Sequence, residues 1–383
     1  MADGLTTGAP ARKSACLATK LTRSMTGPRP RPHLEQVALY KGGDGPKRAG
    51  GHKLSSNENP LGCSPSARKA LEDTLGRLEV YPDGNCVALR NAIGSVYGLD
   101  AARIFVGAGS DEVFQLLGQA YLSPGDEVIQ SASGFLVYRL IAQQAGAAVI
   151  SAPETEYGAD VDALLDAVTD RTRLVFLANP NNPTGTYLPH EDVMRLHAGL
   201  RDDILLVLDG AYAEYVRKNG YSGGFELAGS APNVLTTRTF SKIHGLAALR
   251  VGWAYGPQTV IDALNKVRGP FNVSAPAQAA AEAAILDTAF GDASADHNAV
   301  EMERLVGTLT ALGLTPVPSA ANFLLLPLDG PEAVSALDAY LRDRDIVVRR
   351  LDSYGLPHCL RISIGTTDAN SALIDALNAF LGQ

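Results

Sequence analysis

The sequence has few cysteines, and none of them stands at the spacing of a metal site. Four occur among 383 residues, and no two of them form a Cys-x-x-Cys pair. The histidines are equally scattered, so the sequence offers no cluster of nitrogen and sulfur ligands, and we expect no metal. Isolated thiols are typical of a reducing compartment, so we expect a cytoplasmic protein with reduced Cys16, Cys63, Cys86 and Cys359.

An excess of positive charge and a long apolar run are also absent. The formal net charge is -8, which disfavours nucleic-acid binding because the phosphate backbone requires a basic surface. No uninterrupted apolar segment reaches the roughly 18 to 20 residues that cross a bilayer. Apolar residues nevertheless make up 46% of the chain, which is enough for a large core. We therefore expect a soluble protein with no nucleic-acid partner and no membrane contact.

The first 33 residues differ in composition from the rest of the chain. Asp3 is their single acid, and the run Gly-Pro-Arg-Pro-Arg-Pro lies near their end. Their basic residues are Arg12, Lys13, Lys20, Arg23, Arg29 and Arg31. Proline-rich basic segments do not build a packed core, so we predict a disordered tail over residues 1–33. An organellar transit peptide and a natural start at Met25 are alternative interpretations.

Beyond the tail, apolar segments alternate with segments of helical periodicity. We predict strands at 104–106, 128–129, 147–150, 174–177, 204–208, 234–237 and 252–255. We predict helices at 88–97, 111–120, 136–145, 162–168 and 191–199. Strands that are apolar throughout and separated by helices predict a mostly parallel sheet covered on both faces. We assign this sheet to a large domain over residues 76–270, with ligands expected at the carboxyl ends of its strands.

A different pattern follows residue 270. Helices are predicted at 276–286 and 299–312, and the second is long enough to bridge two domains. Strands are predicted at 323–326, 346–348 and 360–363. We expect these elements, together with residues 34–75, to form a smaller α+β domain.

A single lysine, Lys242, stands in an unusual setting after the apolar segment 234–237. Small and hydroxyl residues surround it, and Arg250 follows eight positions later. Burial lowers the pKa of a lysine, and a neutral amine can condense with an aldehyde. This chemistry points to pyridoxal 5'-phosphate (PLP), whose phosphate would need Thr239, Ser241 and Arg250. A lysine that extends its charge from a strand end into solvent is the alternative interpretation.

Polar residues also follow three other predicted strands. Gly-Ala-Gly-Ser-Asp-Glu comes after 104–106, and its backbone could approach an anion at the start of a helix, although a plain turn would have the same composition. Asn182 lies in a rigid Asn-Pro-Asn-Asn-Pro-Thr-Gly loop, where its amide could bind a phenolate oxygen. Asp209 ends a buried strand, where a carboxylate needs a partner such as a pyridinium N–H. A helix cap or a local turn is the alternative for Asp209.

These motifs, in this order, resemble the fold-type I PLP-dependent aminotransferases, and more narrowly the histidinol-phosphate aminotransferase family. The resemblance runs from Ser-Ser-Asn-Glu-Asn-Pro at 55–60 to Leu-Arg-Ile-Ser-Ile-Gly-Thr at 360–366, nearly the whole chain after the tail. It implies an α/β fold of type I, with a mostly parallel sheet of the seven-stranded type in the large domain and a smaller α+β domain.

The resemblance also assigns roles to single residues. It implies that Lys242 binds the cofactor covalently and carries protons, that Asp209 pairs with the pyridinium, and that Asn182 and Tyr212 donate to the phenolate oxygen. Phe135 would stack on the cofactor ring. The implied phosphate ligands are Ala108, Gly109, Ser110, Thr239, Ser241 and Arg250.

Two further groups of residues concern the subunit partner and the substrate. The resemblance implies that Tyr81 reaches the phosphate of a neighbouring subunit, and hence a homodimer. It places Arg361 at the α-carboxylate of glutamate and Asn57 in the same region. Arg361 alternates with apolar residues on a predicted strand, and its planar guanidinium suits a carboxylate. Arg349 is the candidate for a second anion, such as a substrate phosphate.

The sequence thus predicts an enzyme that exchanges an amino group between L-histidinol phosphate and 2-oxoglutarate by a ping-pong route. An aromatic amino acid aminotransferase and a PLP-dependent lyase or cyclase of specialised metabolism are the alternatives. Three positions depart from the family pattern. Gly210 stands where most relatives have glutamate, Ala108 where a polar residue is usual, and His244 where a larger apolar or aromatic residue is common. We expect His244 to be a packed histidine and Gly210 to loosen the backbone beside Asp209.

Overall fold

The structure is a computed structural model, and it describes residues 28–39, 42–218 and 220–382. Residues 1–27, which hold most of the predicted disordered tail and Cys16, lie outside the described residues. The end of the predicted tail takes part in the fold, because Pro32 and His33 begin the 3-10 helix η1 (Pro32–Gln36). The His33 ring lies 3.0 Å from the carbonyl oxygen of Gln144.

In the described part of the chain, seven strands form the main sheet, in the order β2-β10-β9-β8-β7-β3-β4. Only β10 runs antiparallel to its neighbours. This confirms the predicted α/β fold with a mostly parallel sheet. The strands are β2 (Ile104–Gly107), β3 (Glu127–Ser131), β4 (Ala148–Ala152), β7 (Thr172–Ala178), β8 (Leu205–Asp209), β9 (Val234–Thr239) and β10 (Gly252–Tyr255).

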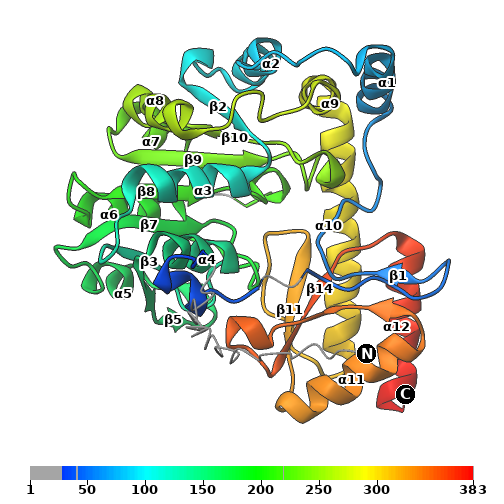
Figure 1. Cartoon of the computed structure of the whole chain (residues 1–383). Helices are drawn as coiled ribbons and strands as arrows, with labels where there is room; N and C mark the ends of the chain where they lie inside the picture. The colour runs from blue at the N-terminus through cyan, green and yellow to red at the C-terminus, as the bar shows by residue number, and fades with distance from the viewer. Residues whose placement is uncertain (1–27, 40–41, 219, 383) are drawn as a thin grey trace, which may run out of the picture.

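Helices cover both faces of this sheet (Figure 1). One face packs against α3 (Ser110–Tyr121), α4 (Leu136–Ala145) and α8 (Gln258–Val267). The other packs against α2 (Val87–Tyr97), α5 (Val161–Asp166), α6 (His190–Gly199) and α7 (Phe225–Ser230). Because both faces are covered, the central strands are buried along their whole length, which explains the apolar run of β8 before Asp209. A short hairpin of β5 (Glu154–Thr155) and β6 (Gly158–Ala159) follows β4.

A second layer of structure holds the C-terminal part of the chain. An antiparallel sheet has the order β11-β14-β13, and β1 pairs in parallel with β12. The strands are β1 (His52–Lys53), β11 (Phe323–Pro327), β12 (Ile346–Val347), β13 (Arg349–Arg350) and β14 (Cys359–Ser363). Their apolar side chains form a separate core with α11 (Pro331–Asp343) and α12 (Thr367–Leu381).

One long helix connects the two layers (Figure 1). It is α10 (Thr288–Ala311), whose 24 residues extend about 36 Å at 1.5 Å per residue. It begins eleven positions before the predicted 299, because Asp287 caps it by accepting from the Phe290 N–H. Among the described residues, no helix combines the length and the apolar character needed to cross a bilayer.

The division of the chain at residues 75 and 270 stays a prediction, and the packing suggests where it needs adjustment. Helices α1 (Pro65–Thr74) and α9 (Ala275–Leu286) pack against each other, and α9 also packs against α2. Ala67 and Ala277 belong to the same apolar cluster as the main sheet. We therefore propose to count both helices with the large domain rather than with the small one.

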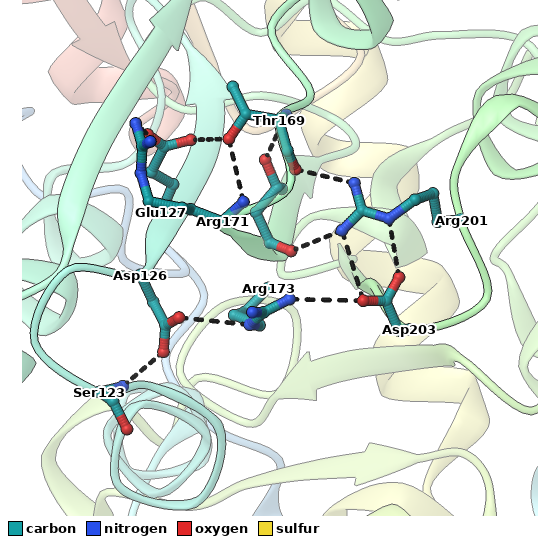
Figure 2. A network of polar contacts seen from close by, with 9 residues as sticks. Ser123, Asp126, Glu127, Thr169, Arg171, Arg173, Arg201 and Asp203 are labelled. Atoms are coloured by element: carbon teal, nitrogen blue, oxygen red, sulfur yellow. Dashed lines mark hydrogen bonds and ion pairs between the residues drawn. The ribbon is translucent and has the colours of Figure 1, made fainter.

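A polar network ties together the amino ends of the central parallel strands, at the edge opposite the carboxyl ends (Figure 2). Glu127, which is 3% exposed at the start of β3, accepts from the Thr169 hydroxyl at 2.5 Å and pairs with Arg171. Arg173 in turn joins Asp126 at 3.2 Å and Asp203 at 3.3 Å. The network connects the segments that enter β3, β7 and β8, so it fixes their alignment.

Replacing Glu127 with glutamine should lower the free energy of unfolding by roughly 1–3 kcal/mol at about neutral pH, because two charge-assisted hydrogen bonds weaken. The hydrogen bonds from Thr169 and Arg171 lower the pKa of Glu127 below its usual 4.5. The contribution of Glu127 to stability is therefore fully present above pH 4.5, and it is lost as the pH falls through the pKa that Glu127 has in the folded protein. Urea unfolding should show the difference between wild type and variant shrinking in acid.

Asp203→Asn is the control, since Asp203 belongs to the same network but its carboxylate is 59% exposed. It should cost much less stability than Glu127→Gln. An equal loss in the two variants, or a loss for Glu127→Gln that does not depend on pH, would contradict this account.

Candidate active site

Most of the predicted site residues come together in one cavity of about 240 Å³ at the carboxyl ends of the parallel strands. This volume is several times the roughly 30 Å³ that one water occupies in the liquid. Strand ends β8 and β9 supply one wall, and β13 and β14 of the C-terminal layer close the opposite side. The predicted residues that line it are Asn57, Ser110, Phe135, Asn182, Asp209, Tyr212, Thr239, Ser241, Lys242, Arg250, Arg349 and Arg361.

Lys242 projects its amine into this cavity. Nζ donates to the Ser56 carbonyl at 3.0 Å and lies 5.7 Å from the centre of the Tyr212 ring. Desolvation, and after it the nearby charge of Arg361, lowers the pKa of Lys242 from 10.5 to about 8. At pH 7 about a tenth of the amine is therefore neutral, far more than for an ordinary lysine, and the neutral form is the one that can attack a carbonyl carbon.

Asp209 lies deeper in the same cavity and is 5% exposed. Its carboxylate accepts from the Tyr138 hydroxyl at 2.5 Å, the Ala211 N–H at 3.0 Å and the Thr237 hydroxyl at 3.3 Å. Burial raises the pKa of Asp209, although these hydrogen bonds oppose the shift. In the described part of the chain, no ion pair joins Asp209 to a cation. A buried carboxylate at a cavity wall fits a cationic N–H of a ring bound there.

The predicted phosphate ligands lie at the end of the cavity where β9 and the start of α3 meet. Arg250 donates to Ser241 Oγ at 3.2 Å and pairs with Asp111 at 3.3 Å. Ser110 is the first residue of α3, so the positive end of the helix dipole faces the cavity. Gly109 has a φ of +87°, and a Cβ there would lie 2.6 Å from Arg250 Nη2, so only glycine fits beneath the guanidinium.

In the predicted phosphate turn, the backbone N–H groups of Ala108 and Gly109 already donate hydrogen bonds within the chain. Ala108 N donates to Glu112 Oε2 at 2.5 Å, and Gly109 N donates to the Gly107 carbonyl at 2.8 Å. Of the predicted turn, Ser110 is the residue that lines the cavity. The roles of Ala108 and Gly109 as direct ligands stay predictions, and the geometry favours an indirect role through the shape of the turn.

Two arginines face the cavity from the C-terminal layer. Arg349 and Arg361 are directly paired across the antiparallel strands β13 and β14. Arg361 is buried and donates to Asn182 Oδ1 at 2.5 Å and to the Ser55 carbonyl at 2.6 Å. Two guanidinium groups side by side suit a ligand with an anionic group at its end.

Tyr81 does not approach the cavity of its own chain. It is 78% exposed and stacks on Phe271, with ring centres 4.7 Å apart. His244, by contrast, is buried beside Phe240 and does not line the cavity. Burial lowers the pKa of His244 to about 4, so the ring is neutral at physiological pH. It is a packing residue, as expected, and gives no titratable group to the site.

Sequence reasoning missed two polar residues that shape the cavity. Tyr138, on α4, donates to Asp209, and Asp111, on α3, pairs with Arg250. Burial raises the pKa of Asp111, although Arg250 opposes the shift. The sequence feature that could have identified Asp111 is its position directly after Ser110, at the start of a helix. Nothing in the sequence marks Tyr138, because its reach depends on how α4 packs on the sheet.

Comparison with known proteins decides the family. The model for aminotransferases of class I and II matches residues 50–377. A histidinol-phosphate aminotransferase of Rhodospirillum rubrum is 52% identical over 359 residues, covering 92% of this chain and 97% of that protein. One from Paramagnetospirillum magneticum is 51% identical over 362 residues, covering 94% of this chain and 100% of that protein. This chain belongs to the histidinol-phosphate aminotransferase family.

The solved structures agree with this assignment. The histidinol-phosphate aminotransferase of Sinorhizobium meliloti, solved in complex with pyridoxal-5'-phosphate, matches with a TM-score of 0.87 at 27% identity. The match covers 94% of this chain and 99% of that one. The predicted fold type, enzyme class and PLP dependence are thereby confirmed. The cavity fits PLP in three respects: the amine of Lys242, the buried carboxylate of Asp209 and the guanidinium of Arg250 at the other end.

The departure at Gly210 has a steric cause in this member of the histidinol-phosphate aminotransferase family. A Cβ at Gly210 would lie 2.0 Å from Arg238 Nη1. Arg238 is 2% exposed and donates to the carbonyls of Thr237 at 2.8 Å and Gly223 at 2.6 Å. It also pairs with Glu214 at 3.6 Å. The glycine therefore makes room for a buried guanidinium that contacts the chain after Asp209, while the expected loosening of the backbone stays a prediction.

Gly210→Ala should lower the free energy of unfolding by roughly 2–4 kcal/mol, because the methyl group displaces a buried charge from its partners. In the background of Arg238→Ala the same change should cost much less, since the clash is gone. Denaturant unfolding of the two single variants and the double variant measures this coupling.

Gly307→Ala is the matched control, because a Cβ at Gly307 on α10 meets nothing within 4 Å. It should be neutral or slightly stabilising. Additive losses for Gly210→Ala and Arg238→Ala would show that the guanidinium does not fill the space beside Gly210.

Proposed function

We propose that this chain transfers the amino group of L-histidinol phosphate to 2-oxoglutarate by a ping-pong route, in the cytoplasm. The observation that carries the proposal is the placement of Arg349 and Arg361 opposite each other, facing the same cavity as Lys242. Histidinol phosphate has one anionic group, its phosphate, and 2-oxoglutarate has a carboxylate at each end. A pair of adjacent guanidinium groups can serve both substrates in turn.

The residues of the cavity then have distinct roles. PLP, when bound, supplies an aldehyde that takes up the amino group and a ring that withdraws electrons. Lys242 holds the cofactor and moves a proton at Nζ as general base and acid. Asp209 keeps a ring nitrogen protonated, and Asn182 and Tyr212 donate to the phenolate oxygen. Ser110, Thr239, Ser241 and Arg250 hold the phosphate, and Phe135 supports the ring face.

The substrate end of the cavity is held by the C-terminal layer. Arg361 is positioned by Asn182 and by the Ser55 carbonyl, so its guanidinium is fixed before a carboxylate arrives. Asn57 lies at the same end and donates to the Tyr212 hydroxyl at 3.0 Å. Arg349, at the neighbouring strand position, is the residue that we assign to the phosphate of histidinol phosphate.

We also propose a homodimer in which Tyr81 reaches the phosphate site of the second subunit. The exposed, stacked pair of Tyr81 and Phe271 supports this, because exposed neighbouring aromatic rings are typical of interaction surfaces.

Half-reactions of the purified PLP-loaded protein test the proposed substrates. Histidinol phosphate and glutamate should each convert the absorbance of the bound cofactor to that of its aminated form, whereas phenylalanine should not, because it offers neither a phosphate nor a side-chain carboxylate to Arg349. Conversion by phenylalanine alone would favour the aromatic aminotransferase. Release of carbon dioxide would favour a lyase.

Arg349→Gln should raise the KM for histidinol phosphate about 10- to 100-fold, the loss expected for one charged hydrogen bond. Arg350→Gln is the matched control, since Arg350 is the next residue and pairs with Asp352 at 2.9 Å. In steady-state kinetics, the KM of the Arg350→Gln control for histidinol phosphate should stay within about twofold of the wild-type value. Equal effects of the two variants would remove Arg349 from the phosphate site.

A further inference from the structure

Ser363 is a buried hydroxyl that the proposed function does not use. It lies two residues after Arg361 on β14, so both side chains extend from the same face of the strand. Ser363 is 3% exposed and does not line the cavity. Its hydrogen bonds nevertheless lead to Tyr212, one of the two predicted phenolate donors.

The chain of hydrogen bonds begins at a group whose role is fixed. The backbone N–H of Asn57 can only donate, and it donates to Ser363 Oγ at 2.8 Å. Ser363 Oγ lies 2.7 Å from Asn57 Oδ1 and gives its one hydrogen to that oxygen. The side-chain amide of Asn57 is thereby oriented with its nitrogen toward the Tyr212 hydroxyl, 3.0 Å away.

This orientation decides what the Tyr212 hydroxyl does. An amide nitrogen only donates, so the tyrosine oxygen must accept from Asn57. The hydrogen of the Tyr212 hydroxyl is then left for an acceptor in the cavity, where a phenolate oxygen of the cofactor needs a donor. If the Asn57 amide were reversed, its oxygen would compete for the tyrosine hydrogen.

The two residues that set this orientation are themselves held in place. Asn57 has a left-handed backbone, with a φ of 57°, which asparagine tolerates better than most residues. The Asn322 side chain donates to the Asn57 carbonyl at 3.0 Å, and the Ser363 N–H donates to the Leu54 carbonyl at 3.0 Å. The orientation of the Asn57 amide is therefore set by β14 and by the segment after β1, and it does not depend on Tyr212.

We propose that Ser363 is a positioning residue, which fixes the Asn57 amide so that Tyr212 acts as a hydrogen-bond donor toward the cofactor. Strand β14 then sets both phenolate donors, since Arg361 contacts Asn182 and Ser363 acts on Tyr212 through Asn57. The proposal rests on the proposed role of Tyr212 but not on the identity of the amino donor.

The test is an absorbance titration of the PLP-loaded enzyme without substrate. Loss of a donor leaves the phenolate oxygen more basic, so the cofactor chromophore should keep its proton to a higher pH. Ser363→Ala should raise the titration midpoint by roughly half to one pH unit, and Tyr212→Phe by at least as much. Ser363→Thr keeps a hydroxyl and should restore the midpoint to within about 0.2 units.

Asn57→Ala supplies a second route to the same result. This variant has no amide for Ser363 to orient, so adding Ser363→Ala to it should shift the midpoint no further. Ser64→Ala is the matched control. Ser64 is equally buried and accepts a backbone N–H from Ala67 at 3.1 Å, but it caps α1 away from the cavity. Its loss should lower stability and leave the midpoint unchanged.

The opposite results would overturn the proposal. A Ser363→Ala variant with the wild-type midpoint would reduce Ser363 to a structural residue, even if its thermal stability fell. Additive shifts for Ser363→Ala and Asn57→Ala would show that the two residues do not act through one orientation. Neither outcome depends on histidinol phosphate, so failure here is distinct from failure of the proposed function.

Discussion

The desolvation of one lysine amine is the constraint on which the rest of the site depends. Lys242 lies in a cavity with Arg361 and Arg250 nearby, so its charged form is disfavoured and its pKa falls to about 8. A mostly parallel sheet makes this possible, because the strand ends bring Lys242 together with Asp209 at one edge. The polar network at the opposite edge fixes the same strands, so the alignment of the site is held from both ends.

The C-terminal layer completes the site rather than merely covering it. Strand β14 brings Arg361 to Asn182, which follows β7 of the main sheet, and Ser363 to Asn57, which donates to Tyr212 after β8. An apolar cluster that contains Tyr212, Ile243 and Phe323 lies between the two layers and joins their cores. If the proposed roles of Arg361 and Ser363 hold, the position of β14 sets both substrate binding and the electronic environment of the cofactor.

Much of this arrangement could be predicted from sequence because the chemistry follows strand ends, and strand ends are visible as the limits of apolar runs. Lys242, Asp209 and Asn182 were found in that way. Tyr138 and Arg238 were not. Tyr138 reaches Asp209 from a covering helix, and its direction depends on tertiary packing. Arg238 is a buried charge within β9, and its contacts can be explained only once the space left by Gly210 is seen in the structure.

The measurement that tests the central claim most directly is the pH dependence of covalent capture of PLP by the cofactor-free protein, trapped by borohydride reduction and mapped by peptide analysis. Capture requires a neutral amine, so the rate should rise with pH around a midpoint near 8, with the label on Lys242. A midpoint near the usual 10.5, or a label on another lysine, would contradict the account.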